Sequence, residues 1–225
     1  MMRQILAGNA TAGYIAPFVA FVVIMAAEHA LLPNSQILYP IRFAVTLAAI
    51  LFISWPYIDW RPKAPLASIV LGIAVFAIWV APDRLFHYRH FWLFDNAITG
   101  TASSSIAPDL KTASWFLAIR ILGSVALVPI AEELFWRGWL MRWLIDNNFQ
   151  KVALGTYAPM AFWVVAILFA SEHGPYWEVG LVAGIAYNWW LIRTRSLADC
   201  MLAHAVTNAV LALWVLATGE WQYWL

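Results

Sequence analysis

The chain has 225 residues, of which 64% are hydrophobic and only 11% are charged, and its mean hydropathy is +0.74. A soluble globular domain has about 25% charged residues, so this composition excludes a soluble protein and indicates an all-α helix bundle that crosses a membrane many times. Membrane lipid is therefore the first partner that we expect. The formal net charge of +1 is too small to predict a nucleic acid as a second one.

At about 20 residues for each crossing, the chain has room for about seven membrane spans and for no separate soluble domain. We therefore predict a single integral-membrane domain over residues 1–225. Cys200 is the only cysteine, which excludes an internal disulfide and a cysteine-based metal cluster. We interpret it as a small apolar helix residue.

The first half of the chain contains three apolar runs. The first, at 12–32, is long enough to be a retained anchor rather than a removed signal peptide, and we interpret Glu28 and His29 near its far end as an interfacial helix end. The second run covers about 37–57 and the third about 66–81.

A polar stretch from Asp83 to Ser114 follows. It combines aromatic residues with a run of small polar residues, a composition typical of an interfacial segment and a loop. His87 and His90 are three residues apart, but without a cysteine or a third histidine nearby they are a weak indication of a metal site. A further crossing within this stretch would raise the number of spans from seven to eight.

The second half of the chain contains four more apolar runs, at about 115–143, 152–173, 177–192 and 197–217. Pro159 interrupts the second of these near its start, and Ser196 with Asp199 has the spacing of a capping box at a helix N-terminus. Arg120 lies one turn inside the first of the four, from which its long side chain can reach the membrane surface.

Three charged residues, Glu132, Glu133 and Arg137, lie within the run at 115–143. A charged side chain at the centre of a membrane helix costs about 2.5 to 3.5 kcal/mol, so these charges need compensation. Glu133 and Arg137 are four residues apart with the acid first, which is the favourable order for an ion pair on one helix face. Glu132 points about 100° away from Glu133 and remains a spare carboxylate, the kind of group that serves as a general base.

The basic residues predict the orientation in the membrane. In a seven-span arrangement, most of the basic residues outside the spans lie on the same side of the membrane: Arg3, Arg61, Lys63, Arg142, Lys151, Arg193 and Arg195. Short cytoplasmic loops carry an excess of Lys and Arg, so we predict a multi-pass protein of the cell membrane with its N-terminus in the cytoplasm.

Two more polar sites occur in the last three runs. His173 follows Phe169 by one helical turn, so the aromatic ring can hold the imidazole by packing. His204 and Asn208 are four residues apart on one face of an apolar helix. Ionisable groups inside a membrane are functional candidates by default, and neighbouring helices can bring these sites together with Glu132.

The pattern Glu-Glu-x-x-x-Arg, then Phe-x-x-x-His, then His-x-x-x-Asn, on successive helices, resembles the CPBP family of intramembrane endopeptidases. This family includes the type II CAAX prenyl proteases and bacteriocin-processing or self-immunity proteins. The resemblance covers residues 115–217, which we expect to form the catalytic core, and it implies neither a metal nor a cofactor. The resemblance implies that Glu132 and His173 activate the attacking water. It also implies that His204 and Asn208 form an oxyanion hole and that Glu133 and Arg137 form a supporting ion pair.

The resemblance also implies a substrate, a peptide or protein with or without a lipid, cut at a peptide bond near a membrane-embedded or lipidated terminus. The chemistry agrees, because a carboxylate and an imidazole can share a water as general bases, and a histidine with an amide can donate hydrogen bonds to a tetrahedral oxyanion. At a helix rise of about 1.5 Å per residue, a span that ends at His173 would place this residue about 10 Å from Glu132 and His204. Helix tilt, the break at Pro159 or a buried extension of the helix at 115–143 would have to close that gap.

Three other functions stay open. Glu132, His173 and His204 are also a two-histidine, one-carboxylate set, as in a zinc protease. The same groups would form a proton relay in a transporter, although no two-fold sequence repeat is visible. In a non-enzymatic membrane protein, such as an immunity factor or a chaperone, they would only hold the helices together.

Overall fold

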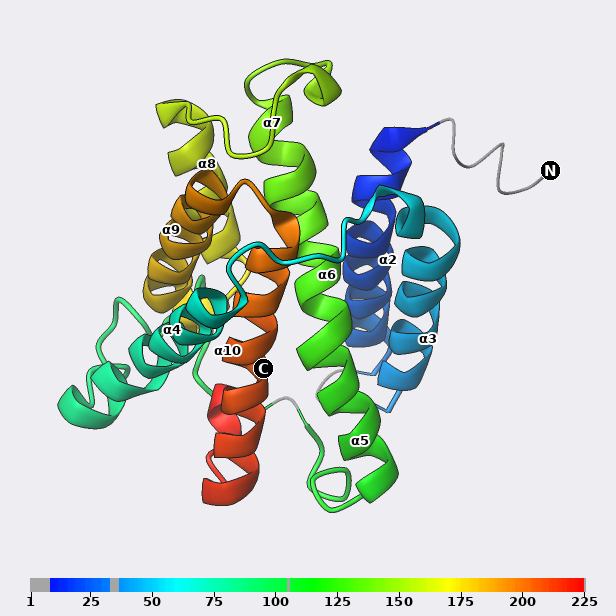
Figure 1. Ribbon diagram of the computed structural model, residues 1–225. Coiled ribbons are helices and arrows are strands. Elements are labelled where there is room, and N and C mark those ends of the chain that lie inside the picture. The colour runs from blue at the N-terminus through cyan, green and yellow to red at the C-terminus, as the bar shows by residue number, and fades with distance from the viewer. Residues whose placement is uncertain (1–8, 33–36, 105, 225) are drawn as a thin grey trace.

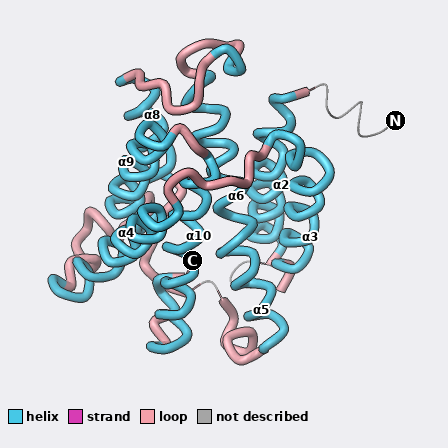
Figure 2. Tube along the Cα trace, viewed as in Figure 1, coloured by secondary structure: helices cyan, strands magenta, loops and turns pink. Residues whose placement is uncertain are grey.

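The computed structural model describes residues 9–32, 37–104 and 106–224. Its long helices pack into one bundle (Figure 1), and loops connect them at the two ends (Figure 2). The prediction of an all-α bundle is confirmed. Arg3, which entered the argument on orientation, lies outside the described residues.

Five helical stretches of the described chain are long and apolar enough to cross a membrane: Ala10–Leu31 (α2), Tyr39–Tyr57, Pro65–Phe86 (α4), Ser114–Trp143 and Leu197–Thr218 (α10). The second consists of α3 (Tyr39–Ala49) and two further turns at Ile50–Ser54 and Trp55–Tyr57. Two helices do not reach these criteria, α8 (Pro159–Ser171, 13 residues) and α9 (Trp177–Thr194, 18 residues). The structure thus supports a multi-pass bundle, whereas the number of crossings stays a prediction.

The long stretch Ser114–Trp143 is not a uniform α-helix. It consists of α5 (Ser114–Leu122), a π-helical turn (Gly123–Leu127), α6 (Val128–Glu133), a second π-helical turn (Leu134–Leu140) and α7 (Met141–Trp143). In an α-helix, side chains four residues apart differ in direction by about 40° around the helix axis. The wider π turn reduces this difference. As a result, four residues at this spacing line the same cavity: Arg120, Ser124, Val128 and Glu132.

The helix α10 lies beside α6 in the middle of the bundle, with α2 and α3 on one side and α8 and α9 on the other (Figure 1). The side chains of Ser196 and Asp199 fix the start of α10. The Ser196 hydroxyl oxygen accepts a hydrogen bond from the Asp199 backbone N–H at 3.2 Å, so the predicted helix start is confirmed. The Asp199 carboxylate also accepts hydrogen bonds from the backbone N–H groups of Lys63 and Ala64, at 2.7 and 2.8 Å, which attaches the start of α4 to α10.

Two predicted helix boundaries are wrong. The run predicted at 66–81 continues as α4 to Phe86, because Asp83 in its last turn is held by the Tyr223 hydroxyl at 2.5 Å and by Arg89 at 3.4 Å. The run predicted from residue 152 begins only at Pro159, since proline has no N–H and its fixed φ angle suits the first helical position. The helix α8 is therefore about 20 Å long, and His173 lies less deep in the bundle than a helix starting at residue 152 would place it.

Two predicted surface positions are also wrong. Arg120 is only 5% exposed and its guanidinium lies over the rings of Tyr39 and Trp224, so its side chain does not reach the membrane surface. Glu28 is 4% exposed and pairs with Arg42 at 3.5 Å instead of ending a helix at the interface. Both residues are buried because α2 and α3 pack beside the long helix and close one side of an internal cavity.

Candidate active site

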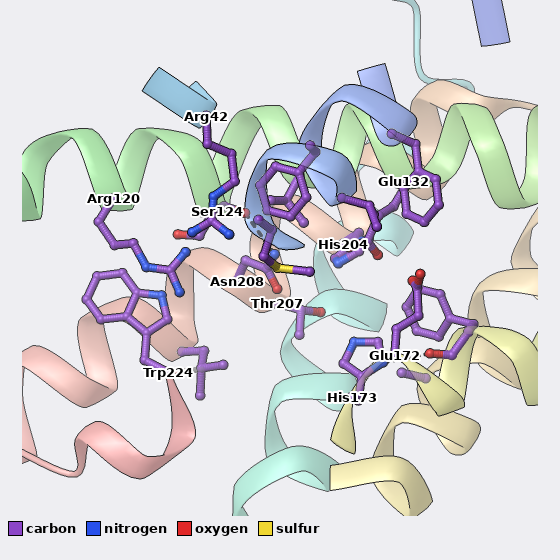
Figure 3. Close-up of a pocket in the computed structure, with 18 of the residues that line it drawn as sticks. Arg42, Arg120, Ser124, Glu132, Glu172, His173, His204, Thr207, Asn208 and Trp224 are labelled. Carbon is purple, nitrogen blue, oxygen red and sulfur yellow. Dashed lines mark hydrogen bonds between the residues drawn. The ribbon is translucent and has the colours of Figure 1, made fainter. Parts of the chain in front are cut away.

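A cavity of about 660 Å³ lies inside the bundle. Its walls come from α2, α3, α4, the long helix Ser114–Trp143, the end of α8 and the residues that follow it, α9, α10 and the C-terminal residues Tyr223 and Trp224. All four residues with a predicted catalytic role line it: Glu132, His173, His204 and Asn208 (Figure 3). The structure thus brings together side chains from three separate helical regions, and the shortened α8 removes the gap expected for His173.

Glu132 lies in α6, and its carboxylate faces the cavity. Its Oε2 atom is buried and has no hydrogen-bond partner among the described residues. A buried carboxylate oxygen without a partner costs about 1 to 3 kcal/mol or more, so this oxygen is available to a water molecule or a ligand in the cavity. Glu172 and His173 lie at the same end of the cavity (Figure 3).

His173 follows α8 and is held on two sides. Its Nδ1 lies 2.7 Å from the Phe169 backbone carbonyl oxygen, which can only accept, so Nδ1 carries the proton and donates. In the neutral ring, Nε2 is then a proton acceptor. The ring packs 4.7 Å from the Phe169 ring, as the spacing predicted, and 5.2 Å from Trp79 of α4. Gly180 leaves room for it, because a Cβ atom there would lie 3.1 Å from the imidazole.

The ion pair predicted between Glu133 and Arg137 is present and fully buried, with Arg137 Nη1 3.2 Å from Glu133 Oε1. The rest of the guanidinium is held by α9, where Arg137 Nε donates to Asn188 Oδ1 at 2.9 Å and Nη2 donates to the Gly184 carbonyl at 3.3 Å. Asn188 was not predicted as part of the site. The available signal was that a lone amide in an apolar run has to find a partner inside the bundle.

His204 also contacts Glu133, with Nδ1 2.9 Å from Oε1, although the sequence assigned this carboxylate to Arg137 alone. The carboxylate accepts, so Nδ1 of His204 carries a proton. For Nε2 to donate a hydrogen bond as well, both ring nitrogens have to carry a proton. The Tyr187 ring stacks on the imidazole at 5.1 Å and fixes its plane.

Asn208 lies one turn after His204 on α10. One N–H of its amide donates to the Ser124 carbonyl at 2.8 Å, which fixes the side chain beside the π-helical turn of the long helix. A primary amide has a second N–H, so one donor remains for a group in the cavity. His204 and Asn208 can therefore present two donors from one helix face.

The cavity also contains polar residues that the sequence did not single out. Glu172 precedes His173 and adds a second carboxylate near Glu132. Thr207 donates its hydroxyl to the Gly72 carbonyl at 2.9 Å and thereby joins α10 to α4. Within the described ranges, no group of three His, Cys, Asp or Glu side chains is arranged to hold a metal ion.

Residues 114–210 match the family model described as Type II CAAX prenyl endopeptidase Rce1-like. The match begins at the start of α5, ends within α10 and leaves residues 1–113 outside. No curated protein and no solved structure matches the chain. The resemblance that the three motifs predicted is thereby confirmed for the segment 114–210, which contains every candidate catalytic residue and matches the type II CAAX prenyl endopeptidase family.

Proposed function

We propose that the protein is an intramembrane endopeptidase that cuts a peptide bond near a membrane-embedded or lipidated terminus, without a metal. The observation that carries this proposal is the content of one cavity in an apolar bundle. It holds a carboxylate with an open oxygen (Glu132), an imidazole with an open acceptor nitrogen (His173) and a pair of donors (His204 and Asn208).

In the proposed reaction, a water molecule binds between Glu132 and His173. One of these groups takes a proton from the water while its oxygen attacks the carbonyl carbon of the peptide bond. The carbonyl oxygen becomes an oxyanion, which accepts hydrogen bonds from His204 Nε2–H and the free amide N–H of Asn208. The captured proton then passes to the nitrogen of the leaving amine, and the peptide bond breaks.

The cavity walls fit a lipidated or membrane-embedded substrate. The side of the cavity formed by α2 is largely apolar and includes Phe18, Val22 and Met25. An acyl or prenyl chain would lie against these side chains, whereas the polar residues would contact the peptide. Residues 115–217 would then supply the chemistry, and α2, α3 and α4 would complete the binding cavity.

Reconstituted protein should be incubated with a panel of lipidated and unlipidated peptides, and the products should be identified by mass spectrometry. We expect one specific cut, and we expect the activity to survive exhaustive chelation because the attacking water is not bound to a metal. A zinc protease would lose activity on chelation and recover it with added zinc. Absence of any cut across the panel would contradict the proposal and favour a non-enzymatic function.

We further propose that the N-terminus is cytoplasmic and that the membrane is the cell membrane. Lys63 Nζ donates to the Arg195 carbonyl at 2.9 Å, so the two basic loops that predicted the orientation meet at one end of the bundle. A Thr194→Cys variant should react with a membrane-impermeant maleimide only from the cytoplasmic side. The native Cys200 is fully buried and gives no background. Labelling from outside the cell would reverse the orientation.

A further inference from the structure

His173 lies beyond the end of α8, in a short turn with few backbone hydrogen bonds of its own. Its N–H donates to the Ala170 carbonyl at 3.1 Å, and its carbonyl accepts from the Tyr176 N–H at 2.9 Å. A segment with so few internal bonds is held in one position mainly by its contacts with the rest of the chain. The contacts of this turn therefore decide how precisely the imidazole is placed.

Arg89, in the segment between α4 and α5, contacts this turn directly. Its Nη1 donates to the Pro175 carbonyl at 2.8 Å, two residues after His173. Its Nη2 lies 2.9 Å from the Glu178 carboxylate in the first turn of α9, and its Nε lies 3.4 Å from the Asp83 carboxylate in the last turn of α4. The side chain of Arg89 is only 7% exposed. One buried guanidinium thus joins the turn to the ends of two helices.

A row of stacked rings forms a second connection between Arg89 and His173. The guanidinium carbon of Arg89 lies 3.9 Å from the centroid of the Tyr176 ring, which is fully buried. The rings of Tyr176 and Trp79 are stacked, with centroids 6.0 Å apart and an angle of 15° between their planes. The Trp79 ring in turn meets the His173 imidazole edge to face at 5.2 Å. Because packed interiors have few voids, a displacement of the guanidinium would change the packing around the imidazole.

The proposed reaction depends on the position of this imidazole, because Nε2 has to contact the same water molecule as Glu132. The hydrogen bond from Nδ1 to the Phe169 carbonyl at 2.7 Å determines which nitrogen is the acceptor. Where that acceptor lies depends on the backbone of His173 as well. A displacement of about 1 Å from the reactive geometry can cost about 100-fold in rate, even when its cause is far from the reacting atoms.

We propose that Arg89 is a positioning residue, which fixes the turn that begins at His173 and thereby places Nε2 of His173 beside the water shared with Glu132. This inference rests on the proposed function. It adds to that function a residue from outside the region 114–210 that matches the family model. The candidate catalytic residues would then depend on the segment between α4 and α5 for their geometry, although this segment contributes no group to the reaction.

Two variants in the same group of charges separate positioning from stability. Arg89→Met removes the donor to the Pro175 carbonyl, and it is combined with Glu178→Gln so that this carboxylate is not left without its cation. Asp83 keeps the hydrogen bond from the Tyr223 hydroxyl in the double variant. Glu178→Gln alone is the matched control, because it removes the same carboxylate while the hydrogen bond from Arg89 to the Pro175 carbonyl remains.

The kinetic test measures kcat and KM per folded protein on the best peptide of the panel. Arg89→Met/Glu178→Gln should lower kcat by roughly 10- to 100-fold and change KM by less than about twofold, because a misplaced imidazole affects the reaction more than substrate binding. Glu178→Gln should keep the kcat of the unmodified protein. Arg89→Lys, which retains a cation and a donor, should keep more of the rate than the double variant. Equal kcat in the control and the double variant, or a change in KM alone, overturns the inference.

A nitrogen-15 NMR spectrum of histidine-labelled protein tests the same inference without requiring a cut. The His173→Gln variant identifies the ring signals of His173 among those of the five histidines. The unmodified protein and Glu178→Gln should each show one set of signals for His173, with the proton on Nδ1. In the double variant, a loosened turn should weaken the hydrogen bond to Phe169, so signals with the proton on Nε2 should appear as well. Unchanged His173 signals in the double variant overturn the inference, whereas the expected change without a cut of any peptide contradicts the proposed function alone.

Discussion

Glu132 and Glu133 are neighbours in the sequence, yet they belong to two different polar regions. Glu133 is fully buried in an enclosed network, where its Oε1 atom contacts both Arg137 and His204. Glu132 lines the cavity, whereas Glu133 does not. In each of the two carboxylates, the Oε2 atom has no hydrogen-bond partner in the part of the chain that the structure describes. The enclosed region joins α6, α9 and α10, whereas the open region places the Glu132 carboxylate at the wall of the cavity.

His204 belongs to both regions. Its Nδ1 contacts the enclosed carboxylate, and its ring lines the cavity. A substitution in the network would therefore affect the cavity through the orientation of this single ring. If the enclosed region holds the helices and the cavity is the proposed reaction site, substitutions in the two regions should have different effects.

The largest effect is expected for Glu132→Gln. An amide cannot take a proton from water, so the cleavage rate should fall by roughly 100- to 10,000-fold, the usual contribution of a general base. The thermal unfolding temperature in detergent should stay near that of the unmodified protein, because Oε2 has no partner to lose. A variant with near-native activity would contradict the assignment of Glu132 as the base.

Glu133→Gln should have the next largest effect, and it should act on folding. Breaking a buried ion pair by removing one partner costs about 3 to 5 kcal/mol, so the yield of folded protein and its unfolding temperature should both fall. The double variant Glu133→Gln/Arg137→Met removes the uncompensated cation and should recover part of the loss. If Glu132→Gln and Glu133→Gln behave alike in both assays, the two regions are not distinct.

Asn208→Ala separates binding from chemistry within the cavity. Loss of one oxyanion donor should lower kcat by roughly 100- to 1000-fold while KM changes little, because the donor acts on a charge that exists only in the transition state. The measurement is a full rate curve on the best peptide of the panel. A rise in KM with unchanged kcat would instead assign Asn208 to substrate binding.

Gly180→Ala should have the smallest effect. The added Cβ atom would lie 3.1 Å from the His173 ring and push it off its preferred rotamer. Such a displacement costs about 0.5 to 1.5 kcal/mol, which corresponds to roughly a 2- to 12-fold loss of rate. The control is Val182→Ala on the exposed face of the same helix, for which we expect the rate of the unmodified protein. Equal rates for both variants would show that His173 is not held by this contact.

Much of the candidate site was predictable because its residues are charged or polar side chains within apolar runs of the sequence. Glu132, Glu133 and Arg137 are charges in an apolar run, and His204 with Asn208 shares one helix face, so simple helical spacing places them. The start of α10 was predictable for a similar reason, since its cap depends on residues three apart. These are local properties, for which the sequence is sufficient.

The parts that were not predictable depend on contacts between distant segments. Glu28 and Arg120 look like helix-end residues, and only the packing of α2 and α3 beside the long helix shows that both are buried at one cavity. The double use of Glu133 by Arg137 and His204 depends on two separate helices. The late start of α8 was not predictable because a proline near the start of an apolar run can either interrupt a helix or be its first residue, and Pro159 is the first residue.

The π-helical turn at Gly123–Leu127 determines how a change in chain length affects the cavity. A π turn accommodates one residue more than an α turn, so a deletion of one residue there leaves a continuous helix. Twelve residues of uninterrupted α-helix would turn Arg120 about 120° away from the direction of Glu132, whereas eleven residues turn it by only about 20° beyond whole turns. A deletion of one residue at the turn would therefore leave both side chains on the cavity wall. The π turn thus makes this part of the cavity tolerant of a chain that is one residue shorter.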